Sequence, residues 1–139
     1  PAHLVTREFF TLVYEKLSED GVMVINIGRS AQDRSLVDAL SATVAQAFPA
    51  VFITDLPDSY NTILFAARNP QASWEAFDRN LKLLNAPGVN SPLGQIMAIT
   101  QGGRVETRFA DMIFTDDKAP IEFMTNRLVI TFLLGGDKE

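Results

Sequence analysis

The sequence predicts an α/β domain, in which helices flank a small mixed sheet that ends in an antiparallel hairpin. Three observations predict this class. The run VMVINI, residues 22–27, is apolar at every position except Asn26 and is typical of a strand. Two further apolar stretches, residues 50–56 and 62–68, are separated only by PDSYN, and so short a loop joins antiparallel strands. Apolar residues at helical spacing precede and follow the first strand.

The first half of the chain reads as helix, strand, helix, strand, strand. Thr6 can cap a helix over residues 7–18, with Glu8 suiting the positive end of its dipole. The largely apolar character of residues 22–27 predicts a strand buried on both faces. Ser35 and Asp38 resemble a capping box at the start of the second helix.

The second half of the chain changes character. Ser73 is expected to cap one helix, and Ser91 followed by Pro92 starts another that ends at the Gly102–Gly103 pair. Periodicity does not decide whether the apolar segment before Leu134 is helix or strand. We therefore expect one domain, with a helix–strand–helix–hairpin core over residues 1–70 and a mainly helical extension over residues 71–139.

Composition excludes several classes of function. A net charge of −5 argues against a nucleic-acid surface, which requires clustered Lys and Arg. The absence of cysteine excludes disulfides, thiol nucleophiles and Cys-ligated zinc. The longest apolar stretches are far shorter than the roughly 20 residues of a membrane span. These observations predict a cytoplasmic protein with no nucleic-acid partner and no membrane contact.

The sequence also lacks the motifs of a cofactor site. A dinucleotide or adenosyl site normally has a glycine-rich turn after its first strand, whereas Gly28 stands alone and fits a simple turn. His3 is the only histidine, and Asp116 and Asp117 form an adjacent acid pair. We expect the acid pair to cap a helix rather than bind a metal. We therefore predict no metal and no cofactor held by this chain alone, and no catalytic residue within it.

The hairpin turn contains the remaining candidates for ligand contact. Asp58 and Tyr60 lie in PDSYN, and loops at strand ends are where ligand contacts concentrate. The same residue types are also those that turns require. Asp58 and Tyr60 are therefore candidates for substrate binding.

Four segments resemble the spermidine synthase-like proteins, the polyamine aminopropyltransferases. The "T-x-E-F" helix leads into a "DG-V-hydrophobic" strand within HLVTREFFTLVYEKLSEDGVMVIN, residues 3–26. FPAVFITDLP and FAARNP are similar to the final helix and hairpin of that family, which has a Rossmann-like methyltransferase fold. The tail IFTDDKAPIE, Ile113–Glu122, is similar to the family's C-terminal motif. The resemblance implies the C-terminal half of that fold, with a front half that holds the cofactor and catalytic acid lying outside this chain.

The resemblance also implies a function and further site residues. Asn26 matches a polar residue, usually Gln, that lies near the amine substrate, and Leu56 stands approximately where the family has a polyamine-binding tyrosine. Tyr60 is a possible substitute. The implied reaction transfers an aminopropyl group from decarboxylated S-adenosylmethionine to a diamine such as putrescine, and we expect this chain alone to be inactive.

Three alternatives stay open. The chain could belong to an S-adenosylmethionine-dependent methyltransferase. It could instead be a non-catalytic interaction or oligomerisation module, because an inner strand without its neighbour exposes unpaired backbone groups. On that ground we predict a homodimer through the sheet edge, or pairing with the front half. The third alternative is a complete small enzyme that uses Pro1 or the Asp116–Asp117 pair.

Overall fold

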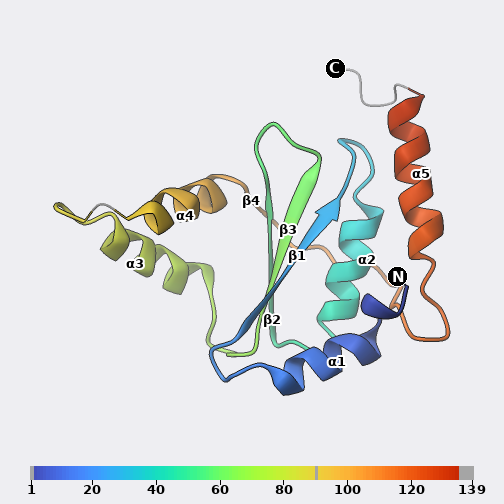
Figure 1. The fold of residues 1–139 in the computed structure, drawn as a ribbon, viewed down its shortest axis with the longest axis horizontal. Coiled ribbons are helices and arrows are strands. Elements are labelled where there is room, and N and C mark those ends of the chain that lie inside the picture. Colours follow the sequence, from blue (N-terminus) through green and yellow to red (C-terminus); the bar gives the residue numbers. More distant parts are fainter. Residues whose placement is uncertain (1, 90, 135–139) are drawn as a thin grey trace.

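The computed structural model describes residues 2–89 and 91–134 and places helices on both faces of a four-stranded sheet (Figure 1). In chain order the elements are η1 (Ala2–Leu4), α1 (Arg7–Lys16), β1 (Val22–Gly28), α2 (Ser35–Val44), β2 (Ala50–Asp55), β3 (Asn61–Ala67), α3 (Trp74–Leu84), α4 (Pro92–Gly102), β4 (Arg104–Val105) and α5 (Ile121–Leu133). The α/β class is confirmed, with the elements of a partial Rossmann-like fold, and the undecided last segment is a helix.

The strand order is β1-β3-β2-β4, and each neighbouring pair is antiparallel. The predicted hairpin is confirmed as β2 and β3. Because β3 lies between β1 and β2 and opposes both, β1 and β2 point the same way. Their carboxyl ends therefore meet at one edge of the sheet, beside the hairpin turn. The sequence predicts three strands, and the fourth was missed because β4 is only two residues long.

The expectation that the first strand is buried on both faces is wrong for the described chain. Val22 is 50% exposed and Val24 is 56% exposed, whereas Ile27 on the opposite face is buried. β1 lies at the end of the described sheet and pairs only with β3. Its apolar run thus leaves one face and one edge open.

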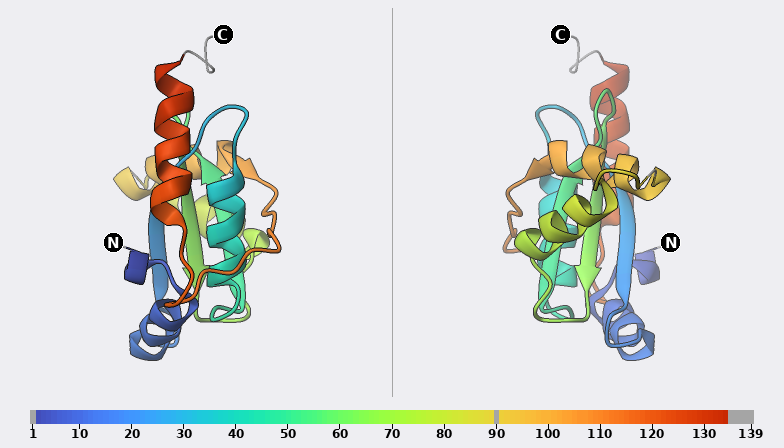
Figure 2. Two further views of the ribbon diagram at one scale, coloured as in Figure 1. Left: turned by 90° about the vertical axis from the view of Figure 1, so that its right-hand side faces the viewer. Right: turned by 90° about the vertical axis from the view of Figure 1, so that its left-hand side faces the viewer.

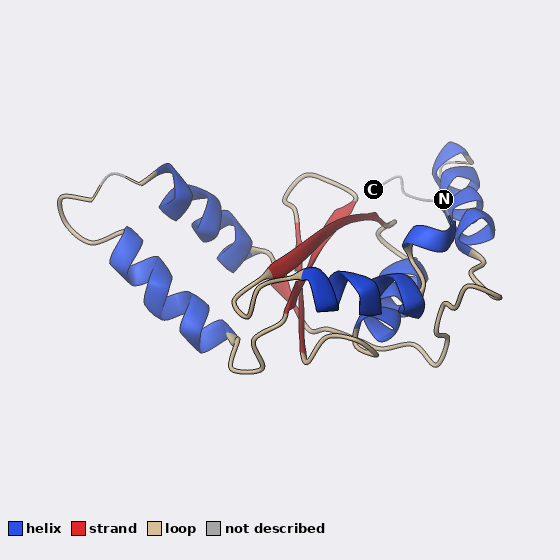
Figure 3. Cartoon of the chain, turned by 60° about the horizontal axis from the view of Figure 1, so that its bottom comes forward, coloured by secondary structure: helices blue, strands red, loops and turns tan. Residues whose placement is uncertain are grey.

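Helices cover the two faces of the sheet unequally. The side views place α1, α2 and α5 on one face and the α3–α4 pair on the other (Figure 2). Figure 3 shows the α3–α4 pair projecting away from the sheet. The core consequently lies on the side of α1, α2 and α5.

The tail of the chain completes this core. Phe114 is fully buried and Met124 of α5 is 8% exposed, and both join residues of the sheet and of the first two helices. The fully buried members at the centre are Phe10, Val37, Val44, Ile53, Leu64 and Ala66. At an order of 1.5–3 kcal/mol for each large apolar side chain, this burial is the main stabilising contribution to the fold.

Helix starts follow the predicted capping in three of four cases. The side chains of Thr6, Ser73 and Ser91 accept hydrogen bonds from backbone N–H groups in the first turns of α1, α3 and α4. The capping-box expectation for α2 is wrong, because Ser35 is itself the first helical residue. Asp33 instead accepts from the Ser35 backbone N–H at 2.9 Å.

Candidate functional site

A groove of about 460 Å³ runs along the free edge of β1 towards its carboxyl end. Its walls are the edge strand, the start of α2 and one side of α5. The lining residues are Val5, Ile25, Asn26, Ile27, Gly28, Arg29, Leu36, Leu40, Tyr60, Ile121, Thr125, Leu128 and Val129. In open α/β sheets, ligands bind at the carboxyl ends of the strands.

The groove brings together two of the three predicted substrate-binding residues. Asn26 is exposed on β1, and Tyr60, 41% exposed, lies in the hairpin turn just before β3. They lie close because β1 pairs with β3, which begins at Asn61. Asp58 is not part of the groove. It is exposed at the tip of the turn, where its φ of 51° fits the left-handed conformation that Asp tolerates. The geometry of Asp58 therefore fits a turn residue rather than a residue of the groove.

α5 is fixed to the rim of this groove by a polar contact. Arg127 donates to Asp33 Oδ2 and to Ser35 Oγ, each at 2.6 Å. The contact joins α5 to the loop before α2. It therefore positions the apolar side of α5 that forms the outer wall.

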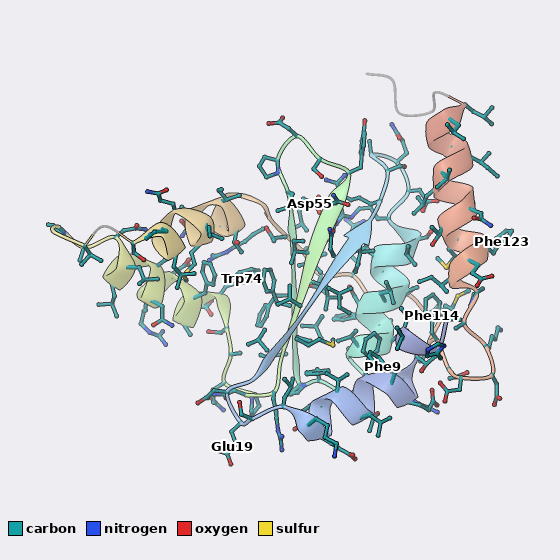
Figure 4. All side chains as sticks on the ribbon, viewed as in Figure 1. Phe9, Glu19, Asp55, Trp74, Phe114 and Phe123 are labelled. Carbon is teal, nitrogen blue, oxygen red and sulfur yellow. The ribbon has the colours of Figure 1, made fainter. Side chains whose placement is uncertain are left out.

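Asp55 organises the polar end of the site. It ends β2, and Figure 4 shows it at the same end of the sheet as the hairpin. Its carboxylate accepts two hydrogen bonds from Arg34, at 2.8 and 3.1 Å, and one from Thr62 Oγ1 at 2.6 Å. Arg29 Nε lies 3.3 Å from the same carboxylate. One acidic group therefore holds two guanidinium groups.

These contacts determine the protonation of Asp55. Partial burial by itself would raise the pKa of this carboxyl group. The hydrogen bonds from Arg34 and Thr62, with the charges of Arg34 and Arg29, outweigh burial and hold the pKa below its ordinary value. Asp55 is thus ionised at neutral pH and serves as a fixed anchor.

Arg29 is the groove residue that sequence reasoning missed. Its side chain is 13% exposed, and it donates to Thr62 Oγ1 at 3.2 Å and to the Ser59 carbonyl oxygen at 3.3 Å. It lies three residues after Asn26, in the loop that follows a strand, and a charged residue at that position indicates a possible ligand contact. Its contact with Asp55 joins two strands and has no signature in the local sequence.

The described lining of the groove contains amide, hydroxyl and guanidinium groups but no carboxylate and no histidine. Such a site can orient and hydrogen-bond a ligand. It has no side chain of the type that usually removes a proton at neutral pH.

The acid pair in the tail has a structural role at Asp116. The hydroxyl of Thr6 donates to Asp116 Oδ1 at 2.6 Å, and the Asp116 backbone N–H donates to Glu8 Oε2 at 3.1 Å. Asp116 thus contacts the start of α1 instead of capping a helix of its own, and that expectation is corrected. Among the described residues, no group of three or more His, Cys, Asp or Glu side chains has metal-site geometry. Pro1 lies outside the described residues.

No helix within residues 2–89 and 91–134 combines the length and apolarity required to cross a bilayer.

Comparison with known proteins adds one relationship. The chain is 32% identical over 137 residues to a probable polyamine aminopropyl transferase of Bifidobacterium longum (strain NCC 2705). The match covers 89% of this chain and 31% of that protein, so the chain spans about a third of its relative's length. No family model matches the chain, and no solved structure matches it. The predicted resemblance to spermidine synthase-like proteins is confirmed by this similarity.

Proposed function

We propose that this chain, a relative of the polyamine aminopropyltransferases, forms the amine-binding wall of an aminopropyltransferase site. The observation that carries the proposal is the groove at the carboxyl end of β1, which contains the predicted residues Asn26 and Tyr60. The sequence similarity supports the same class of reaction.

In the proposed reaction, the neutral nitrogen of a diamine such as putrescine attacks the carbon beside the sulfonium of decarboxylated S-adenosylmethionine. A C–N bond forms, the C–S bond breaks with its electron pair going to sulfur, and the new ammonium group loses a proton. The protein contributes mainly by positioning the amine and excluding water. S-Adenosylmethionine is the donor in the methyl-transfer alternative.

The groove residues have defined parts in this proposal. The carboxamide of Asn26 accepts a hydrogen bond from the amine, and Tyr60 borders the same space. The Arg29 guanidinium lies at the polar end of the groove, 3.3 Å from the Asp55 carboxylate that also binds Arg34. A positive charge beside an amine favours its neutral form, which is the form that attacks.

Amine binding tests the proposal directly. Putrescine is titrated into the chain with and without methylthioadenosine, and the amide resonances of Asn26, Arg29 and Tyr60 are followed by NMR. Loss of one hydrogen bond, about 0.5–1.5 kcal/mol, predicts that Asn26→Ala weakens binding by about two- to tenfold. Asn126→Ala, on the exposed side of α5, is the matched control and leaves the affinity unchanged.

Two outcomes would count against this proposal. Putrescine could shift no resonance of the groove, or both asparagine variants could weaken binding equally. Catalysis is tested separately by mass spectrometry with either donor and putrescine. Because the described groove lacks a basic carboxylate or histidine, we expect no aminopropyl or methyl transfer by this chain alone, and one turnover above background would overturn that expectation.

A second proposal concerns assembly. We propose that β1 pairs through its free edge with the same strand of a second copy. The strand VMVINIG contains no charged side chain and no proline that would discourage pairing, and Val22 and Val24 beside the edge are half exposed. Sedimentation of the chain over a range of concentrations should show a dimer, and a monomer at the highest concentration would contradict it.

A further inference from the structure

A second cavity lies on the opposite face of the sheet, at the other end of β1 from the groove. It has a volume of about 340 Å³ and is enclosed by the sheet and α3. Four aromatic side chains form its walls. Phe52 and Phe65 are direct cross-strand partners on β2 and β3, and Trp74 and Phe77 come from α3. Figure 4 shows Trp74 between α3 and the sheet.

Neighbouring rings of this group meet edge to face. The ring centroids of Phe52 and Trp74 are 5.1 Å apart with an interplanar angle of 61°. Those of Trp74 and Phe77 are 5.5 Å apart at 82°. None of the four rings is fully buried. The face of an aromatic ring carries the negative part of its quadrupole, so a ring face that borders a cavity attracts a cation.

The rim of the cavity carries one charge, and that charge is negative. Asp20 is exposed at the rim, and its Oδ1 accepts a hydrogen bond of 3.2 Å from Asn69 Nδ2. Asn80 supplies a second amide from α3. Among the described residues that line the cavity there is no Lys, Arg or His.

Two nearby arginines lie outside the lining and have other partners. Arg104 stacks over Trp74 and Phe77, with its Cζ 4.1 and 5.0 Å from the two ring centroids. Its charge is balanced by two hydrogen bonds to Asp78. Arg68 stacks on Tyr14, on the core side of the sheet, and donates to a carbonyl of the loop after α1. Neither places an unbalanced positive charge in the cavity.

We propose that this cavity binds an alkylammonium group carried on a short aliphatic chain. The ring faces attract the cationic head, the Asp20 carboxylate provides its counter-charge, and the methylene groups pack against the aromatic walls. The net charge of −5 adds a favourable long-range attraction for cations. A cationic head matches the lining better than an anion does, because the charged residue of the lining is the Asp20 carboxylate. The site is separate from the groove at Asn26 and does not depend on the function proposed for that groove.

The chain contains one tryptophan, which is Trp74, so intrinsic fluorescence reports on this cavity directly. The purified chain is titrated with 1,4-diaminobutane, with tetramethylammonium chloride and with 1,4-butanediol, at an ionic strength held constant with NaCl. We expect a saturable change for both cations and an affinity at least tenfold weaker for the uncharged diol.

Substitutions locate the binding. Asp20→Asn should weaken cation binding by about two- to fivefold, as expected for a charge at an exposed rim. Phe77→Leu should weaken it further by removing a ring face, while Asp111→Asn, at an exposed position elsewhere, serves as the matched charge control. Circular dichroism confirms that each variant is folded.

Three results would overturn the inference. The first is the absence of a saturable signal with either cation, and the second is equal affinity for the diol and the diamine. The third is an unchanged cation affinity in both Asp20→Asn and Phe77→Leu, with both variants folded. A signal abolished by Asn26→Ala would assign the binding to the groove and would overturn it as well. If 1,4-diaminobutane changes the Trp74 fluorescence but shifts no NMR resonance of the groove, the result supports binding in this cavity and contradicts the function proposed for the groove.

Discussion

Replacing Asp55 with asparagine should loosen the polar end of the groove, and the size of the effect follows from its contacts. The carboxylate accepts hydrogen bonds from Arg34 and Thr62 and lies against Arg29. Asp55→Asn keeps the size of the side chain but removes its charge. Two guanidinium groups that are 13% and 27% exposed then lose their counter-charge.

The expected loss of stability is about 2 kcal/mol. Hydrogen bonds to charged groups contribute about 1.5–3 kcal/mol, whereas fully exposed ion pairs contribute about 0–1 kcal/mol. The partial burial of the Asp55 cluster places it between these limits. With a urea dependence of about 2 kcal/mol/M, the unfolding midpoint should fall by about 1 M.

The pH dependence supplies an independent check. The folded pKa of Asp55 lies below its ordinary value of 3.8, so the ionised carboxylate contributes stability above that pH. The contribution is lost as the pH falls below 3.8 and through the folded pKa. At neutral pH the Asp55→Asn variant should therefore have a lower free energy of unfolding than the original chain. On acidification its free energy of unfolding should fall by less than that of the original chain.

Urea unfolding followed by circular dichroism at several pH values measures both effects. Asp111→Asn removes an exposed charge and should change the midpoint little. A loss below about 0.5 kcal/mol at pH 7 would refute the reasoning, because the cluster would then behave as an ordinary surface ion pair.

Three further changes test other parts of the fold by the same unfolding measurement. Thr6→Val removes the cap of α1 and its hydrogen bond to the tail, and should cost about 1–2 kcal/mol, with Thr6→Ser restoring most of it. Phe114→Ala empties a fully buried position and should cost about 3–5 kcal/mol; an effect below 1 kcal/mol would mean that the tail does not complete the core. Gly103→Ala would place a Cβ only 2.0 Å from the Asp55 carbonyl oxygen and should destabilise by more than about 1 kcal/mol. Gly102→Ala meets nothing within 4 Å and should be neutral or slightly stabilising, so equal effects of the two alanines would contradict the close approach.

Local chemistry explains which elements could be predicted from the sequence. The caps at Thr6, Ser73 and Ser91 use side chains that contact backbone groups three residues away. The β2–β3 hairpin follows from its short connecting turn. These features depend on neighbours in sequence, so residue type and spacing are sufficient to identify them.

The remaining features depend on contacts between distant segments. The pairing of β1 with β3 brings Asn26 beside Ile63 and so places Tyr60 in the same groove, and no local pattern encodes it. Arg29 and Asp55 lie 26 positions apart in the chain, and the local sequence around each predicts only a charged side chain in contact with solvent. The two-residue β4 forms only because Arg104 and Val105 meet β2. The candidate site was therefore predictable as an edge of the sheet, but its composition was not.

The closure of the core by the tail has a consequence for the protein while it is being synthesised. The Phe114 backbone N–H donates to Thr43 Oγ1 at 3.0 Å, and its ring fills the centre of the core. Phe114 lies 47 positions after Ala67, a stretch that takes about 2–10 s to translate at roughly 5–20 residues per second. During that interval the three long strands can already have left the ribosome, yet the apolar surface beneath Phe114 has no cover. We expect the nascent chain to be most prone to chaperone capture and to aggregation in this window.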